Sequence, residues 1–438
     1  LEPAIGPAPA ALDDLAEQAV VFERAYAQTP HSSYSLSSLQ TSEYIHEVVE
    51  LGRELPEATL ASVLRGEGYR TVGFYTDGIF HTEGERLEAY RRGSFGLELH
   101  HSGAPDAESL TDAALHELEI VQEMGEPPTF LWLHYFDAHH PYLETSLGTS
   151  DVDRYDGEVR NVDRALARFV ASARERLKRP VVIAITADHG EEFRDHGGVS
   201  HGTTLYEEQL RVPLLLIAPG IAPRRVSAPV ELVDLAPTLL GLLGVERAPT
   251  MRGDDLRPVS IGQDVALGPA FAGVGHLRGA IDDHHKLIVD LSLGFDQLYD
   301  LAADPRERRN LADEEPARVD ALGGEIDAWL DSLAQPPAGG PRADPRDVAL
   351  GHARMGDRRE VASLREIAVD PDAPVSMRAE ACRLLGQLSD ADGRESTIAT
   401  LATVLGATVF DGDDRAVAYE AAIALGRLGD ERGRRRLR

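Results

Sequence analysis

Short apolar runs alternate with amphipathic stretches along the first three quarters of the chain. The runs TFLWLHYF (129–136) and PVVIAITAD (180–188) are rich in β-branched and aromatic residues. Such runs are typical of strands buried on both faces of a parallel sheet. RVPLLLIAPG (211–220) is a third run, and 106–124 and 153–177 are helical in pattern. The alternation predicts an α/β domain in which helices connect the strands of a mainly parallel sheet.

Two segments near the amino terminus also have clear patterns. LASVLRGEGYRTVGFY (60–75) predicts a helix that stops at Gly68, followed by a strand over residues 70–75. Before it, residues 12–21 predict a helix that follows a Pro- and Ala-rich stretch. The first residue is Leu1 rather than Met, so we expect the true start of the protein to lie upstream.

The composition changes after residue 335. AQPPAGGPRADPRD (334–347) is rich in Pro, Gly and Ala and predicts a linker. Beyond it, EACRLLGQLSD (380–390) and EAAIALGRLGD (420–430) match each other at a spacing of 40 residues, the period of HEAT-like helical repeats. Two such units cannot form a stable solenoid alone, so we expect either a second truncation at Arg438 or a cap that packs on the first domain. A protein partner could also bind through these repeats. The predicted division is an α/β domain at 1–335, a linker at 336–347 and HEAT-like repeats at 348–438.

Composition and charge narrow the classes of ligand. The formal net charge is −30 and the pI is near 4.9, which argues against binding to nucleic acid or to an anionic membrane surface. An anionic substrate would need a local positive site such as a metal ion. The single cysteine, Cys382, excludes an intrachain disulfide framework and a multi-cysteine zinc site. An upstream segment could carry a signal or an anchor, so an extracytoplasmic or membrane-anchored location stays open.

The segment ITADHGEEFRDHGGVSHGTTLYEEQLRVPLLLIAPG (185–220) carries the strongest chemical signal. A predicted strand ends at Ala187, and Asp188 and His189 follow at its carboxyl end, where open α/β sheets bind ligands. This pair offers a carboxylate oxygen and an imidazole nitrogen to a divalent cation. Taken alone, the pair is equally typical of a strand-end turn.

The rest of that segment resembles the sulfatase-like branch of the alkaline-phosphatase superfamily. The family pattern is DHGE, HG, HG, LYEE and RVP in that order, and this chain reproduces all of it between Asp188 and Pro213. A second element, DAHHPY (137–142), resembles the family's D-P-H-x-P-Y, with Ala138 in place of the first proline. The resemblance implies that His139 and His201 bind the anionic oxygens of an ester. His140 occupies a variable position.

A third element, AQTPHSSYSLSSLQTSEY (27–44), aligns with the family's nucleophile segment C/S-x-P-S-R followed by L-x-T-G. Counting back from Thr41 places Ser32 at the nucleophile, with Tyr34 and Leu36 where the family has proline and arginine. Those two residues guide conversion of the nucleophile to formylglycine in sulfatases proper. Their loss resembles instead the phosphatase, phosphodiesterase and phospho-group transferase members, in which an unmodified hydroxyl attacks.

The resemblance implies a divalent metal ion (Ca, Mn or Zn) held by Asp188 and His189 and by aspartates from a strand upstream of the nucleophile. This chain has too little length there for that strand. Asp13 and Asp14 are a weak substitute, because acids in a first helical turn usually complement the helix dipole. A fourth element, DDHHKLIVDLSLGFDQLYDLAADPRERRNLAD (282–313), resembles the family's carboxyl-terminal antiparallel subdomain.

These elements predict a metal-dependent hydrolase of sulfate or phosphate esters that uses Ser32. A phospho-group transferase of the same superfamily is one alternative. An inactive scaffold that binds proteins through its helical repeats is the other. The sequence does not decide whether the ester is a sulfate or a phosphate, which leaving group it carries, or which oligomeric state the protein adopts.

Overall fold

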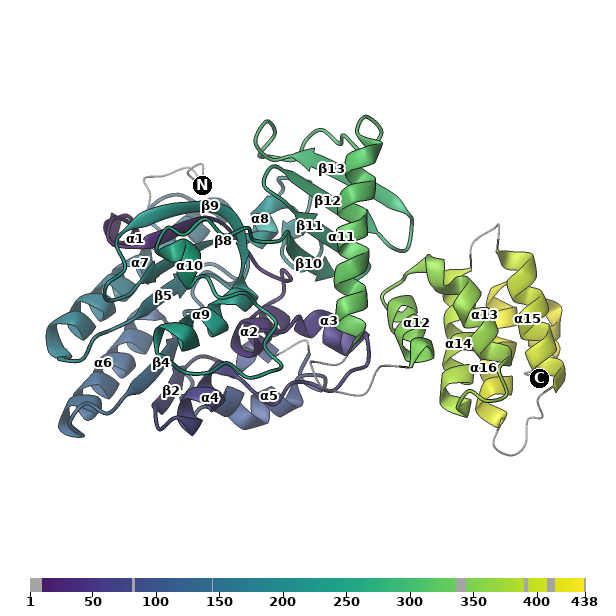
Figure 1. The fold of residues 1–438 in the computed structure, drawn as a ribbon, viewed down its shortest axis with the longest axis horizontal. Helices are drawn as coiled ribbons and strands as arrows, with labels where there is room; N and C mark the ends of the chain where they lie inside the picture. The colour runs from purple at the N-terminus through teal and green to yellow at the C-terminus, as the bar shows by residue number, and fades with distance from the viewer. Residues whose placement is uncertain are drawn as a thin grey trace.

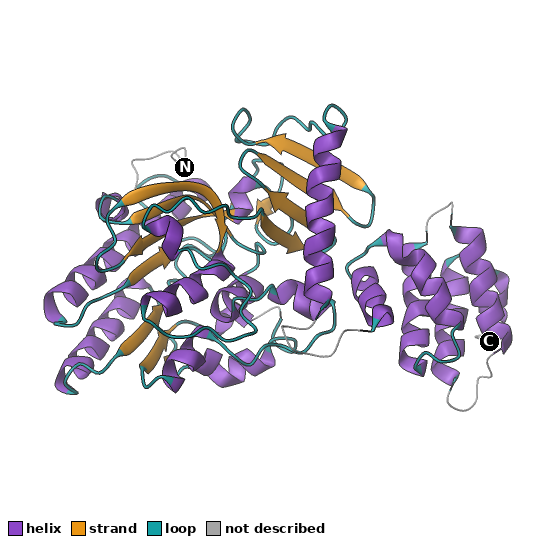
Figure 2. Cartoon of the chain, in the orientation of Figure 1, coloured by secondary structure: helices purple, strands orange, loops and turns teal. Residues whose placement is uncertain are grey.

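The computed structural model describes residues 10–80, 83–143, 145–335, 344–389, 393–407 and 414–436. Figure 1 shows an α/β part, a smaller antiparallel sheet crossed by one long helix, and a carboxyl-terminal group of helices. Figure 2 shows that the described strands all belong to the first two of these parts.

Three parallel strands form the first sheet. The order is β3 (Leu99–His101), β2 (Arg70–Phe74) and β4 (Thr129–Leu133), and Val72 pairs with Leu99 on one side and Leu131 on the other. The strands expected at 70–75 and 129–136 are therefore present, although β4 ends three residues early. One edge of this sheet is β4.

The second sheet is mixed, which corrects the expectation of a mainly parallel arrangement. Its order is β5 (Ile183–Thr186), β8 (Arg211–Ile217), β1 (Val20–Tyr26) and β9 (Arg224–Glu231). Strand β8 runs antiparallel to both β5 and β1, whereas β1 and β9 are parallel. The reason is the connection from β5 to β8, which has only the small hairpin β6 (Glu192–Phe193) and β7 (Val199–Ser200) and a four-residue helix. It lacks the long crossover helix that parallel neighbours need.

Helices cover both faces of the strands. Helix α7 (Asp151–Arg176) connects β4 to β5, and α6 (Ala107–Glu123) packs beside it. Their apolar faces contact alternate residues of the strands, among them Leu131 and Leu133 of β4 and Ile183 and Ile185 of β5. The opposite face of β4 packs on α4 (Leu60–Gly66) and α9 (Leu235–Leu242). Both sheets therefore share α7 as a support.

The helix expected at residues 12–21 is only partly correct. Helix α1 (Ala10–Ala16) is shorter, and β1 starts at Val20. The apolar pair Val20 and Val21 fits a pleated strand, and β1 gains backbone partners on both sides from β8 and β9. Tertiary pairing thus overrides the local helical pattern. The backbone amides of Ala11 and Leu12 donate to Asp163, which fixes α1 on α7.

The smaller sheet is antiparallel, as expected for 282–313. Its order is β10 (Ala270–Val274), β11 (Leu277–Ile281), β12 (His285–Asp290) and β13 (Phe295–Asp300). Helix α11 (Pro316–Ala334) crosses it, and the ring of Trp329 stacks on Phe271 at 5.0 Å.

The described carboxyl-terminal residues are helical. The bounds are α12 (Pro345–Arg354), α13 (Val361–Val369), α14 (Val375–Leu388), α15 (Arg394–Ala407), α16 (Arg415–Arg427) and α17 (Glu431–Arg436). Leu385 and Leu425 are fully buried in α14 and α16, which pack against each other. Residues 336–343 of the expected linker lie outside the described residues. Helix α12 begins before the expected boundary at 348, because Asp344 accepts a hydrogen bond from Arg346 N as its N-cap. Within the described ranges, we find no helix of the length and apolarity that a bilayer crossing needs.

Candidate active site

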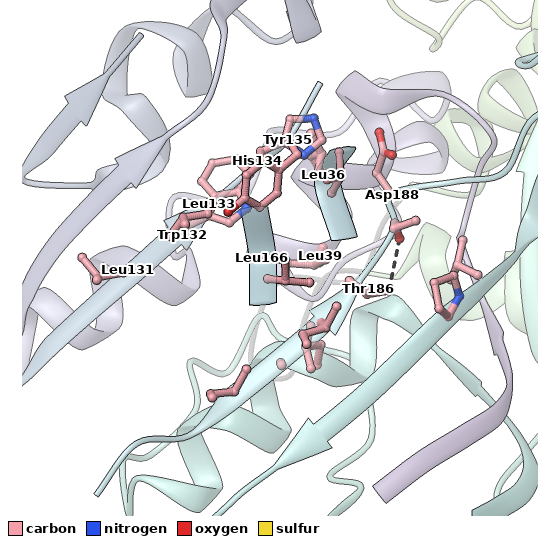
Figure 3. A pocket seen from close by; sticks show the side chains of 18 of the residues that line it. Leu36, Leu39, Leu131, Trp132, Leu133, His134, Tyr135, Leu166, Thr186 and Asp188 are labelled. Atoms are coloured by element: carbon pink, nitrogen blue, oxygen red, sulfur yellow. Dashed lines mark hydrogen bonds between the residues drawn. The ribbon is translucent and has the colours of Figure 1, made fainter. Parts of the chain in front are cut away.

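A cavity of about 1080 Å³ lies between β4 and β5, and we call the end lined by the residues that follow these strands its mouth. Figure 3 shows Leu131, Trp132 and Leu133 of β4 on one side and Thr186 and Asp188 on the other. In the described part of the chain, neither β4 nor β5 has a second strand partner on this side. Every residue of both strands is only half-buried. We call this space the β4–β5 cavity.

Ser32 is the first residue of helix α2 (Ser32–Thr41) and lines the cavity. Its Oγ lies 2.9 Å from Nε2 of His189. The neighbouring Ser33 is fully buried, and its hydroxyl donates to the carbonyl of Ile79. The two serines therefore have separate surroundings, and the one chosen by sequence register is the one beside the histidine.

Asp188 and His189 follow β5, at the mouth of the cavity. Burial alone would raise the pKa of Asp188, but the charges of His189 and His134 and a hydrogen bond from Ser32 outweigh it and hold the pKa below its usual value. Nδ1 of His189 lies 2.8 Å from the carbonyl of Gly190 and donates to it. Nε2 lies 2.9 Å from Oγ of Ser32 and 3.4 Å from Asp188 Oδ2.

His139 and His201 lie next to this pair. The ring of His201 is 4.2 Å from that of His189 and 5.5 Å from that of His139. His139 stacks on Phe136 at 4.4 Å, and its Nδ1 donates to the carbonyl of His140 at 2.6 Å. Burial and the neighbouring His201 lower the pKa of His139, although the bond to His140 opposes the shift. All five residues chosen from the sequence therefore lie in one chain of contacts.

Tyr34 and Leu36, the two residues that depart from the family's nucleophile pattern, each contact other side chains near α2. Leu36 belongs to an apolar cluster under α2, where it is 3 % exposed. The hydroxyl of Tyr34 accepts a hydrogen bond from Arg86 at 3.0 Å. An apolar Leu36 cannot supply the cationic contact that an arginine would give at this place.

Sequence reasoning missed two residues of the site. His134 follows β4, and its buried Nε2 has no hydrogen-bond partner among the described residues. Burial and the nearby His189 and His139 lower its pKa, against the opposing charge of Asp188. Glu191 accepts hydrogen bonds from His201 and Tyr142. Glu191 is inside the DHGE motif, which assigns it no role, and His134 lies three residues before the DAHHPY element, where the sequence gives no signal for it.

The residues at the cavity mouth fit a divalent cation in part. Asp188 offers an ionised carboxylate and His189 an oriented nitrogen, a donor pair that suits Mn or Zn and, with more oxygens, Ca. Two ligands are fewer than any of these ions takes, so further ligands must come from elsewhere. A separate group, His352, Asp357 and Glu360, has its donor atoms within 4.8 Å of one another but lies in the helical tail.

Comparison with protein-family models gives two matches. Residues 5–245 match the model described as Sulfatase. Residues 198–322 match the model of the carboxyl-terminal region of N-sulphoglucosamine sulphohydrolase. The first match covers more than half of the chain and contains the whole cavity mouth.

Individual relatives are more distant. The chain is 29% identical over 161 residues to the uncharacterised sulfatase YidJ of Escherichia coli, covering 35% of this chain and 32% of that protein. It is 29% identical over 168 residues to arylsulfatase K of Xenopus laevis, covering 34% and 31%. The chain thus spans about a third of the length of these relatives. A solved structure from Bacteroides fragilis, described as a sulfatase YidJ, superposes with a TM-score of 0.62 at 19% identity, covering 76% of this chain and 92% of that one.

Proposed function

Because this chain belongs to the sulfatase family, we propose that the full-length protein is a metal-dependent hydrolase of sulfate esters. The observation that carries the proposal is the convergence of Ser32, Asp188, His189, His139 and His201 at one end of the β4–β5 cavity. A hydroxyl, two cation ligands and two anion-binding imidazoles are the groups that transfer of a sulfuryl group needs.

In this proposal Asp188 and His189 hold the cation and Ser32 is the nucleophile. A bound cation would lower the pKa of the serine hydroxyl and offset the negative charge of the ester oxygens. His139 and His201 contact the remaining sulfate oxygens and orient the sulfur toward Oγ of Ser32. The start of α2 lies at the same place, so the partial positive charge of its amino terminus adds to the attraction for an anion.

The reaction proceeds in two displacements. Oγ of Ser32 loses its proton and bonds to sulfur, while the bond from sulfur to the ester oxygen breaks and the alcohol leaves with a proton. Water then attacks the same sulfur and inorganic sulfate departs, while one proton of the water restores the Ser32 hydroxyl and the other leaves with the sulfate or passes to solvent. Protons and charges balance over the cycle without a further reactant.

We also propose that a further β-strand fills the β4–β5 cavity in the active protein. Both strands present unpaired backbone groups toward the same space in the described structure, and such groups normally pair. Both are half-buried, although apolar runs of this kind are usually covered on every side. Helix α7 supports both edges, so an added strand would join the two sheets into one.

The same strand would supply the missing cation ligands. A strand parallel to β4 and β5 ends where Asp188 lies, and carboxylates at that end would complete the coordination. Leu12 lines the cavity, so a segment on the amino-terminal side of α1 can reach it over a short distance. The proposed strand therefore precedes α1, with apolar residues along its length and acids at its end.

Two alternatives use the same residues. A phospho-group transferase would hand the group to an alcohol instead of water, and the absence of the arginine at Leu36 favours phosphorus chemistry over the formylglycine route. An inactive scaffold, with the helical tail as its partner surface, would bind the cation without turnover. Assays of both ester types and of metal binding separate these alternatives.

The test compares this chain with a longer one that includes the upstream segment. We expect the longer chain to hydrolyse 4-nitrophenyl sulfate in the presence of Ca, Mn or Zn and to lose activity with a chelator. Asp188→Asn should abolish metal binding measured by calorimetry, whereas Asp195→Asn, in an exposed acid of the same loop, should not. Turnover that survives the chelator or the Asp188 substitution would refute the proposal. Faster turnover of 4-nitrophenyl phosphate would shift it to phosphate esters.

A further inference from the structure

Glu191 lies two residues after His189, and its carboxylate contacts His201 and Tyr142. Its side chain is 6% exposed. Nδ1 of His201 lies 3.1 Å from Oε1 and 3.3 Å from Oε2, and the hydroxyl of Tyr142 donates to Oε2 at 2.9 Å. Both carboxylate oxygens are thus engaged by side chains of the site, which leaves this carboxylate poorly placed to bind a cation as well.

The contact fixes the ring of His201. A carboxylate accepts only, so Nδ1 of His201 must carry the proton. Nε2, the opposite atom, has no hydrogen-bond partner in the described structure, and His201 lines the cavity. The carboxylate therefore aims Nε2 at the space where the ester would lie.

The contact also joins two loops. Tyr142 belongs to the loop after β4 that carries His139, whereas His201 follows the hairpin β6–β7. Glu191 bonds to both, so it sets the distance between the two imidazoles, whose rings are 5.5 Å apart. Tyr142 is held from its other side by the rings of Tyr155 and Phe193, at 5.6 and 5.9 Å.

We propose that Glu191 is a positioning residue of this site, which orients His201 toward the ester and holds the His139 loop at the correct distance from it. The inference rests on the proposed function for the identity of the anion and deepens it. Carboxylates that orient a functional imidazole from behind typically contribute about 10–100-fold to affinity or activity.

The chain contains a matched control. His196, in the same loop, has Nδ1 2.6 Å from Oε1 of Glu208, so it forms the same kind of pair. Its Nε2 lies 3.2 Å from the carbonyl of Glu307 and is not free for a ligand. His196 also lines the cavity, but both of its ring nitrogens are engaged. Glu208→Gln therefore removes a similar charge from a histidine that has no free nitrogen for a ligand.

The test uses the longer chain, with inorganic sulfate as the probe and a divalent cation present. We expect Glu191→Gln to weaken sulfate binding by about tenfold and Glu191→Ala by more, because glutamine still accepts from Nδ1. Glu208→Gln should leave it unchanged. Nitrogen-15 spectra of the imidazoles should show the Nδ1 proton of His201 in the parent and its loss in Glu191→Ala.

The imidazole spectra test the positioning role of Glu191, and the hydrolysis assay separately tests the proposed reaction. If the His201 ring of Glu191→Ala keeps its Nδ1 proton and orientation, the positioning role is refuted, whatever the activity of the enzyme. If the spectra change as expected but 4-nitrophenyl sulfate is not hydrolysed by the longer chain, the positioning stands and the proposed reaction fails.

Discussion

Lys286→Met should strongly destabilise the part of the chain before residue 336, because Lys286 is a buried cation between two carboxylates. Its Nζ lies 2.9 Å from Glu307 and 3.1 Å from Glu207, and the side chains of Lys286 and Glu307 are fully buried. The amide of Glu207 also donates to Glu307, so the cluster ties β12 to the loop that follows His201. The ion pair therefore supports the site as well as the fold.

The expected magnitude follows from what the substitution leaves behind. Removing one partner of a buried ion pair typically costs about 3–5 kcal/mol, since the remaining charge is uncompensated. Burial and the charge of Glu207 raise the pKa of Glu307 to about 7 even with Lys286 present. Without the cation that pKa rises further. A carboxyl with a raised pKa is best tolerated at low pH, so the loss should be smaller at pH 5 than at pH 8.

The assay is urea unfolding followed by tryptophan fluorescence. Both tryptophans, Trp132 and Trp329, lie before residue 336, so the signal reports this part of the chain alone. The control is the double variant Lys286→Met with Glu307→Gln, which removes the stranded charge and should recover about 1 kcal/mol or more. A loss below 1 kcal/mol, equal losses at both pH values, or no recovery would refute this reasoning.

Three further predictions concern other parts of the chain. Gly386→Ala should destabilise the helical tail by about 1–3 kcal/mol in urea unfolding followed by circular dichroism, because the added Cβ would lie 2.7 Å from Ala424 Cβ. Gly426→Ala, at the matching repeat position, has open space around it and should stabilise the tail by about 0.5–1 kcal/mol in the same assay. Burial raises the pKa of the Cys382 thiol to about 12, so a thiol reagent should label this residue only as the tail unfolds. Labelling that coincides with the tryptophan transition would contradict the expectation that the tail unfolds separately from the rest of the chain. Burial and the charge of Asp234 raise the pKa of Glu231, so the parent protein should lose stability as the pH rises through that pKa. Glu231→Gln should lose less stability than the parent between pH 5 and 8. Equal losses in the two proteins would contradict the raised pKa of Glu231.

The strands predicted best from sequence are those with continuous apolar runs. TFLWL and IAIT could be identified because a strand covered on both faces needs apolar residues at every position. The strand β9, RRVSAPVE, has no such run and was missed, as was β1. The direction of β8 could not be predicted, because apolar periodicity carries no information on which way a strand runs. Only the short connection between β5 and β8 determines it.

The candidate site was predicted as far as its motifs extend. Ser32, His139, Asp188, His189 and His201 lie together, as their positions in the motifs imply. The open edges of β4 and β5 could not be seen in the sequence, since they depend on what pairs with what across the sheet. The role of Glu191 was equally hidden, because it depends on two side chains, ten and 49 residues away, that the fold brings to one carboxylate.

The most direct test of the central claim is a side-by-side assay of Ser32→Ala and Ser33→Ala in the longer, metal-loaded chain. Ser32→Ala should lose several orders of magnitude in turnover of 4-nitrophenyl sulfate while it still binds the cation, because only the nucleophile is removed. Ser33→Ala should keep most of its turnover and lose only about 1 kcal/mol of stability with its bond to Ile79. Turnover by Ser32→Ala equal to that of the parent would contradict covalent catalysis at this residue.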